Sequence, residues 1–310
     1  MSRFQVAGRP ATAWWQFASS TGRQRCRSVE RSATLLVLLL LLSLSACASL
    51  HAESVEESQA ARTGAEADAD SGATPLSQAA PPEVRHFAFS GYDWVTVSSP
   101  ELRGPGPNIF DGRNVDLDSA GRLVLQTAWR GNRWTSAHVF LTRSLGYGRY
   151  ELVLAGQPLP LDDGTVFGFF TWDDNPDFAN REIDIELARW AQPASPLLNF
   201  AVQPTAADSR RVILLDFDFS QAVRLSFEWR PDSVRFAAEQ LDGSGRVEWV
   251  FPEPGYRPLA AAGSDLPAFA VPPKGRERVG INLWLFRGAA PARSARLVVE
   301  SFSFTPLSRL

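Results

Sequence analysis

The sequence predicts an all-β protein, built as a sandwich of two antiparallel sheets. Short segments rich in β-branched and aromatic residues follow one another from residue 86 onward, and Gly, Pro, Asn and Asp separate them as turn signals. No stretch shows a convincing helical period. Many short strands with turns between them are typical of β-sandwiches, and a single domain can reach this size.

The expected strands are the β-rich segments between these turn signals. They span 93–98, 122–128, 137–142, 148–155, 165–172, 182–187, 198–203, 211–216, 223–228, 234–239, 246–251, 277–286 and 295–304. The Pro- and Gly-rich piece 252–274 predicts a long loop over one end of the sandwich.

The N-terminal region has the features of an export signal. Scattered arginines precede the apolar run 35–44, which is too short to span a bilayer but suits a signal-peptide core. The run ends in Leu44-Ser45-Ala46-Cys47, which resembles the lipobox of bacterial lipoproteins. This resemblance implies a signal peptide over residues 1–46 and a lipid anchor at Cys47. The alternative is an ordinary signal peptide with a cysteine at its cleavage site.

The segment after Cys47 has the composition of a tether. Residues 47–85 are rich in Ala, Glu, Ser, Asp and Pro and poor in large apolar residues, so we expect a disordered linker. Ala48 stands where an aspartate often signals inner-membrane retention, which favours the outer membrane of the cell envelope. We expect residues 86–310 to form the folded domain and to act as a monomer. The other cysteine is Cys26, so a mature chain has no thiol pair.

Composition excludes several kinds of chemistry. A net charge of -3 and a pI near 5.7 give no electrostatic case for nucleic-acid binding. The folded part holds only the histidines His86 and His138 and no cysteine, so nucleophilic triads and His/Cys zinc sites are poorly supported. We expect His138 to be a hydrogen-bonded strand residue rather than a base. Carboxylates and aromatic rings remain.

The segment 182–187 alternates carboxylate and aliphatic side chains. On a strand, Glu182, Asp184 and Glu186 share one face, where their like charges repel. A half-solvated strand of an antiparallel sheet can show the same pattern. Glycosidic hydrolysis, however, needs two carboxyl groups. The Cα atoms of Glu182 and Glu186 are about 13 Å apart on a flat strand, but on a concave sheet the carboxyls can lean to the roughly 5 to 5.5 Å of a retaining enzyme.

The wider context of this strand resembles glycoside hydrolase family 16, the family of lichenases and laminarinases. The matching blocks occur in the family's order over roughly residues 86 to 306. They are Leu145–Glu151, Gly164–Trp172, Glu182–Leu187, Phe227–Val234 and Ile281–Trp284.

The resemblance implies a concanavalin-like jelly roll with a substrate cleft across its concave sheet. It also implies Glu182 as nucleophile, Asp184 as electrostatic helper and Glu186 as general acid/base. Sugar-binding positions implied by the family or by aromatic stacking lie at the residues Trp172, Trp190, Asn282 and Trp284. Trp190 shares the parity of the carboxylates if the strand continues past Glu186. Core packing is the alternative for any single tryptophan.

Some positions depart from the family pattern. Asn180 stands two residues before Glu182, where Trp is common, and Leu187 follows the acid/base, where Phe is common. Segment 299–304 lacks the Asp often found in the family's frequent calcium site, so we expect no cofactor, with a structural calcium ion as the less favoured alternative.

We therefore expect a retaining endo-acting hydrolase of β-1,3-1,4- or β-1,3-linked polysaccharide. One alternative is a non-catalytic carbohydrate-binding surface lipoprotein, although degenerate binders usually lose one of the carboxylates that this chain keeps. The other is a transglycosylase, which would share every residue of the site.

Overall fold

A computed structural model describes residues 84–156, 161–205, 211–214, 219–258 and 269–310. The expected signal peptide, Cys47 and all but the end of the expected tether lie outside the described residues, as does the middle of the expected loop 252–274. Within the described ranges, no helix is long and apolar enough to cross a membrane.

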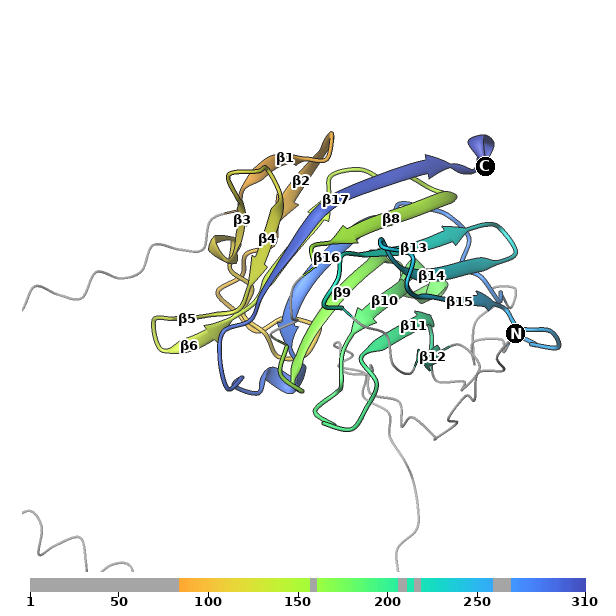
Figure 1. Ribbon diagram of the computed structural model, residues 1–310. Helices are drawn as coiled ribbons and strands as arrows, with labels where there is room; N and C mark the ends of the chain where they lie inside the picture. Colours follow the sequence, from red (N-terminus) through yellow and green to blue (C-terminus); the bar gives the residue numbers. More distant parts are fainter. Residues whose placement is uncertain (1–83, 157–160, 206–210, 215–218, 259–268) are drawn as a thin grey trace, which may run out of the picture. The chain divides into compact units, whose positions relative to one another are not determined.

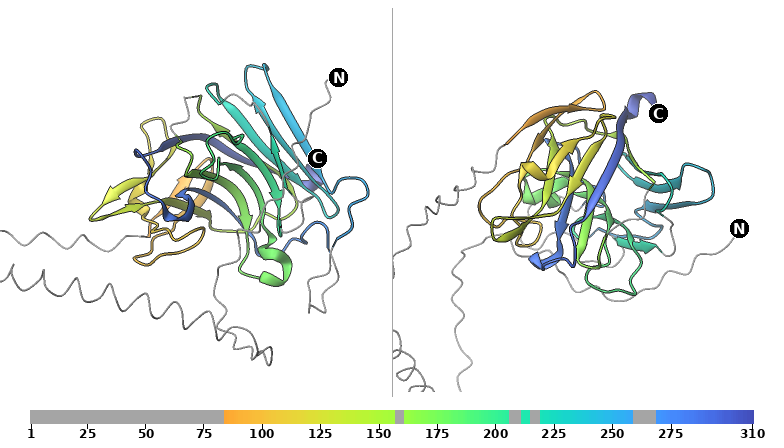
Figure 2. Two further views of the ribbon diagram at one scale, coloured as in Figure 1. Left: turned by 90° about the horizontal axis from the view of Figure 1, so that it is seen from below. Right: turned by 60° about the vertical axis from the view of Figure 1, so that its left-hand side comes forward.

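The described strands form two large antiparallel sheets (Figures 1 and 2). We name the first the acidic sheet; its strands, in spatial order, are β1 (His86–Phe89), β2 (Tyr92–Thr96), β7 (Ala137–Leu141), β16 (Arg278–Leu285), β9 (Thr165–Trp172), β10 (Ile183–Leu187), β11 (Leu198–Val202) and β12 (Arg211–Leu214). The second sheet contains β15 (Arg246–Phe251), β14 (Val234–Gln240), β13 (Val223–Trp229), β8 (Gly148–Leu154), β17 (Arg296–Pro306), β4 (Leu123–Gln126) and β3 (Val115–Leu117).

The remaining elements are short. A separate hairpin consists of β5 (Ala128–Arg130) and β6 (Arg133–Thr135), and the described 3-10 turns are η1 (Gly112–Asn114), η2 (Pro176–Arg181), η4 (Phe286–Gly288) and η5 (Leu307–Arg309).

The hydrophobic core fills the space between the two sheets. Phe169 of β9 contacts Phe227 of β13 with ring centroids 5.3 Å apart, and Phe200 of β11 stacks on Phe236 of β14 at 5.1 Å. These four rings are fully buried. Burial of each large apolar side chain contributes roughly 1.5 to 3 kcal/mol, so the core can hold the sandwich together without disulfides.

The two sheets differ in their outward faces. Strand β8 alternates buried and half-buried residues, as expected for a strand with one face on the core. Strands β9, β10, β11 and β16 are instead buried almost throughout. We call the face of the acidic sheet turned away from the second sheet its outer face. The side chains at its centre are mostly buried, although several of them are polar.

The predicted two-sheet sandwich is confirmed, and strands β9 and β15 have the predicted bounds. The short strands β1, β3, β5 and β6 were not predicted. Each has only 3 or 4 residues, which is too few for an alternating pattern to stand out.

Candidate functional site

Strand β10 places the three predicted acids on the outer face of the acidic sheet. Its aliphatic residues Ile183 and Ile185 are fully buried in the core, so the opposite parity must face outward. Asp184 and Glu186 are only 4% and 7% exposed, whereas Glu182, just before the strand, is half-buried. Of the three, Glu182 is the acid most open to solvent.

Neighbouring strands extend this site across the sheet. Glu186 pairs with Gly168 of β9, Gly168 with Asn282 of β16, and Asn282 with His138 of β7. A Cβ added to Gly168 would lie 2.6 Å from Asn282 Oδ1, so the missing side chain leaves room for Asn282 to lean across β9. We call these positions the Glu186 row.

The acids interact strongly with one another. Burial raises the pKa of Glu182 well above its usual range, and the negative charges of Asp184 and Glu186 and a hydrogen bond with Asp184 raise it further. Gln203 Nε2 donates a hydrogen bond to Asp184 Oδ2 at 3.1 Å, and this bond holds the Asp184 carboxyl in place. Glu182 therefore keeps its proton at a pH where an isolated glutamate is ionised.

The turn before Glu182 has a strained backbone. Ala179, Asn180 and Arg181 have φ values of 51°, 55° and 49°, in the left-handed region that costs most residues roughly 1–2 kcal/mol each. Such conformations persist only where the surroundings impose them. Here the turn sets the direction in which the chain enters β10.

A buried ion pair fixes this turn. Arg181 Nη1 lies 2.7 Å from Asp173 Oδ2, and both side chains are less than 10% exposed. Arg181 Nε donates to Pro273 O at 2.8 Å, and the Arg276 backbone N–H donates to Asp173 Oδ2 at 3.0 Å. The Asp173–Arg181 clamp thus ties the ends of the β9–β10 connection to a distant loop. Sequence reasoning missed it, because Arg181 read only as a neighbour of the nucleophile.

Two of the predicted tryptophans, Trp172 and Trp284, lie at opposite ends of the line of acids that runs from Glu182 to Glu186. Trp172 is half-buried, pairs with Arg278 of β16, and lies toward Glu182. Trp284 is 2% exposed and pairs with Val166, beyond Glu186. Because Val166 and Trp172 are six residues apart on β9, these positions are separated by about 20 Å.

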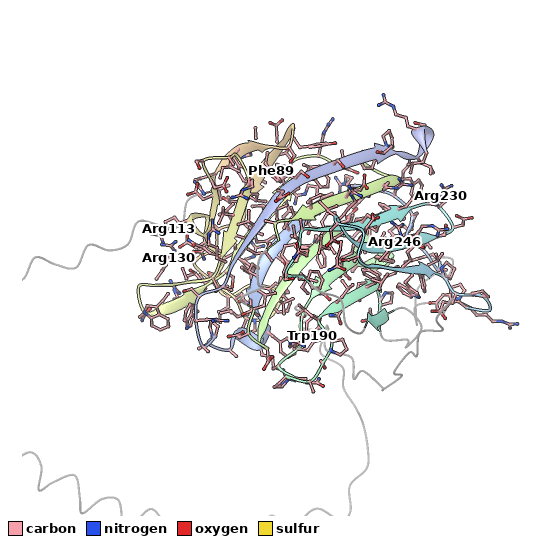
Figure 3. The ribbon with its side chains drawn as sticks, viewed as in Figure 1. Phe89, Arg113, Arg130, Trp190, Arg230 and Arg246 are labelled. Carbon is pink, nitrogen blue, oxygen red and sulfur yellow. The ribbon has the colours of Figure 1, made fainter. Side chains whose placement is uncertain are left out.

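Trp190 lies near the Glu186 end of the line of acids, in a turn that follows β10. Strand β10 ends at Leu187, as expected, and Trp190 follows in a turn with φ 56°, so the condition under which it would share the parity of the carboxylates is not met. Its Nε1 donates to Asn199 Oδ1 at 3.1 Å, and its ring lies 6.3 Å from that of Trp284. Figure 3 shows Trp190 near the end of the sheet where β16 runs into η4.

His138 is not the hydrogen-bonded strand residue we expected. Within the described part of the chain, both of its ring nitrogens and Asn282 Oδ1 are buried without a hydrogen-bond partner. The imidazole is surrounded by rings, with Phe140 at 4.5 Å and Phe110 at 5.1 Å. Burial lowers the pKa of His138 to about 3, helped by the charges of Arg103 and Arg278.

This shift predicts an acid-sensitive fold. The histidine is neutral in the folded state down to about pH 3 but gains a proton near 6.5 when unfolded, so its contribution to stability is present above pH 6.5 and is lost as the pH falls toward 3. Between pH 7 and pH 5 the loss is about 2 kcal/mol. Urea unfolding at both pH values should show the wild type losing that much more stability than His138→Phe. Equal losses would contradict the shift.

No set of three or more His, Cys, Asp or Glu side chains in the described ranges is arranged to hold a metal ion.

Comparison with known proteins identifies the fold. No protein-family model matches the chain, and no curated protein is significantly similar to it. Among solved structures, the Bacillus licheniformis β-glucanase matches with a TM-score of 0.51 and 17% identity over 72% of this chain and 97% of that one. A prokaryotic β-1,3-1,4-glucanase (lichenase) from a mouse hindgut metagenome matches with a TM-score of 0.51 and 18% identity over 72% and 99%. The chain shares the fold of these β-glucanases, as its resemblance to family 16 implies.

Proposed function

We propose that this chain is a retaining, endo-acting glycoside hydrolase that cleaves β-1,3-1,4- or β-1,3-linked polysaccharide. The carrying observation is the row of three interacting carboxyls on one face of β10. The fold shared with two β-glucanases supports the same substrate class.

The proposed reaction has two displacements at the anomeric carbon. In the first, the Glu182 carboxylate attacks that carbon while the Glu186 carboxyl gives its proton to the departing glycosidic oxygen. This forms a glycosyl ester on Glu182 and releases one sugar fragment. In the second, the Glu186 carboxylate takes a proton from water, whose oxygen attacks the anomeric carbon and frees Glu182. Two inversions give net retention.

The charges of the three acids link the two steps of this reaction. Ester formation removes the negative charge of Glu182, so Glu186 loses its proton more readily in the second step. Asp184, hydrogen-bonded to Gln203 and to Glu182, holds the position between them and favours a proton on the neighbouring acids. Because the raised pKa belongs to Glu182, the first step requires that the proton pass to Glu186 when the sugar chain binds and leave Glu182 ionised.

Export and lipid attachment form a separate part of the proposal. The lipobox-like sequence ending in Cys47 supports a chain anchored in the bacterial envelope, with the outer membrane favoured by Ala48.

A polysaccharide screen tests the activity. The chain should release oligosaccharides of several lengths from mixed-linkage β-glucan or β-1,3-glucan, and NMR should detect the β-anomer first. Release of the α-anomer first would contradict the double displacement, and binding without turnover would indicate a lectin. Products longer than the starting oligosaccharide would identify a transglycosylase.

A further inference from the structure

The Glu186 row contains two side chains, His138 and Asn282, with buried polar atoms that have no hydrogen-bond partner among the described residues. We infer that His138, together with Asn282, reads a hydroxyl group of the bound sugar chain and so determines which sugar the site accepts. This inference rests on the proposed function.

The strand register places Asn282 and His138 in line with Glu186 across the sheet, where a sugar chain that crosses the strands would contact them. Asn282 is two strands from Glu186 and His138 is three, so their backbones are about 10 Å and about 14 Å from that of Glu186. Only Gly168 lies between Asn282 and Glu186, and it has no side chain to block the way. Half-buried Phe140 lies beside His138 on the same face.

The unpaired atoms are costly to the fold. Leaving a buried donor or acceptor unsatisfied costs about 1–3 kcal/mol, and buried polar groups in native proteins are rarely left so. His138 is 6% exposed and Asn282 is 3% exposed, yet both ring nitrogens and the amide oxygen lack a partner within the described residues. Phenylalanines surround the imidazole, and an apolar residue there would suit the fold better. Local conflicts of this kind occur where function requires them.

The chemistry of the pair matches a hydroxyl group. A neutral imidazole offers one N–H donor and one nitrogen acceptor, and the Asn282 oxygen adds a second acceptor. A sugar hydroxyl can accept a hydrogen bond from the imidazole N–H and donate its own proton to Asn282 Oδ1, so it would satisfy one polar atom of each residue. The nearby charges of Arg103 and Arg278 oppose protonation of the imidazole. His138 therefore acts as a specificity residue for a neutral sugar group, not as an acid or base.

The substitution His138→Phe separates a ligand-reading role from a structural one. Because it removes unpaired polar atoms, it should raise the thermal unfolding midpoint by about 2–4 °C. It should also lower kcat/KM by about 10- to 100-fold, mainly through KM, because the sugar hydroxyl loses its partner. His138→Gln, which keeps a donor and an acceptor, should recover part of that loss.

Controls distinguish the possible outcomes. His86→Phe changes an exposed histidine of β1 outside the row and should leave stability and kcat/KM unchanged. The inference is overturned if His138→Phe is less stable than the wild type, which would mean a partner within the fold, or if kcat/KM stays within twofold. Failure of the proposed function would give a different result, since either the wild type itself would show no turnover or Glu182→Gln would hydrolyse polysaccharide at the wild-type rate.

Discussion

Glu182→Gln is expected to reduce kcat on β-glucan on the order of 10⁴-fold or more, because it removes the proposed nucleophile from a double displacement. The substitution keeps the size of the side chain, so the strained turn and β10 should remain folded. Reducing-sugar release at saturating substrate measures the effect.

The same substitution, Glu182→Gln, should increase the free energy of unfolding at pH 7 while it lowers kcat. The folded state raises the pKa of Glu182, so this glutamate favours folding at low pH, and that contribution is lost as the pH rises past its ordinary value of 4.5 toward the higher folded one. At pH 7 the neutral glutamine should therefore make the fold more stable than the wild type. Glu248→Gln, on an exposed position of β15, is the matched control and should change neither property. Full activity of the Glu182→Gln variant would show that Glu182 is not the nucleophile.

Loss of the Asp173–Arg181 clamp should damage both folding and catalysis. Arg181→Gln leaves Asp173 as a buried carboxylate without its cation, and breaking a buried pair in this way costs about 3–5 kcal/mol. The turn at Ala179–Arg181 would then relax. A displacement of about 1 Å at Glu182 can lower kcat on the order of 100-fold with little change in KM. Denaturant unfolding and steady-state kinetics measure the two effects.

A surface ion pair and a double variant provide the comparison. Arg149, whose side chain is 43% exposed, pairs with Glu228 on the second sheet, so Arg149→Gln should cost less than about 1 kcal/mol and leave kcat unchanged. Adding Asp173→Asn to Arg181→Gln should restore part of the stability but not kcat, because the neutral pair no longer imposes the strained turn. If Arg181→Gln and Arg149→Gln lost equal amounts of stability and of kcat, the clamp would have no special role.

The fold could be predicted because it depends on patterns within each strand. The parity of Glu182, Asp184 and Glu186 and the bounds of β9 followed from local alternation and turn residues, and the structure agrees. Strands β5 and β6 were missed because they pair over only three residues each, which is too short for an alternating pattern to be recognised in the sequence.

The site was less predictable because its parts come from distant segments. The clamp joins Arg181 to Pro273, 92 residues away, and the Glu186 row exists only through the registers of β7, β16 and β9. No local pattern indicates that His138 would lie among phenyl rings without a hydrogen-bond partner. The position of Trp190 could not be predicted from strand parity, because it lies in a turn rather than on an extended strand.

Covalent trapping on Glu182 tests the central claim most directly. A 2-deoxy-2-fluoro β-glucosyl oligosaccharide with an activated leaving group should react once and leave the slowly hydrolysed glycosyl ester on the chain. Mass spectrometry of the digested protein should then find one added 2-fluoro-oligosaccharyl group, the reagent without its leaving group, on the peptide that contains Glu182, and on that residue. Turnover without any trapped adduct, or an adduct on Glu186 instead, would contradict the assigned roles.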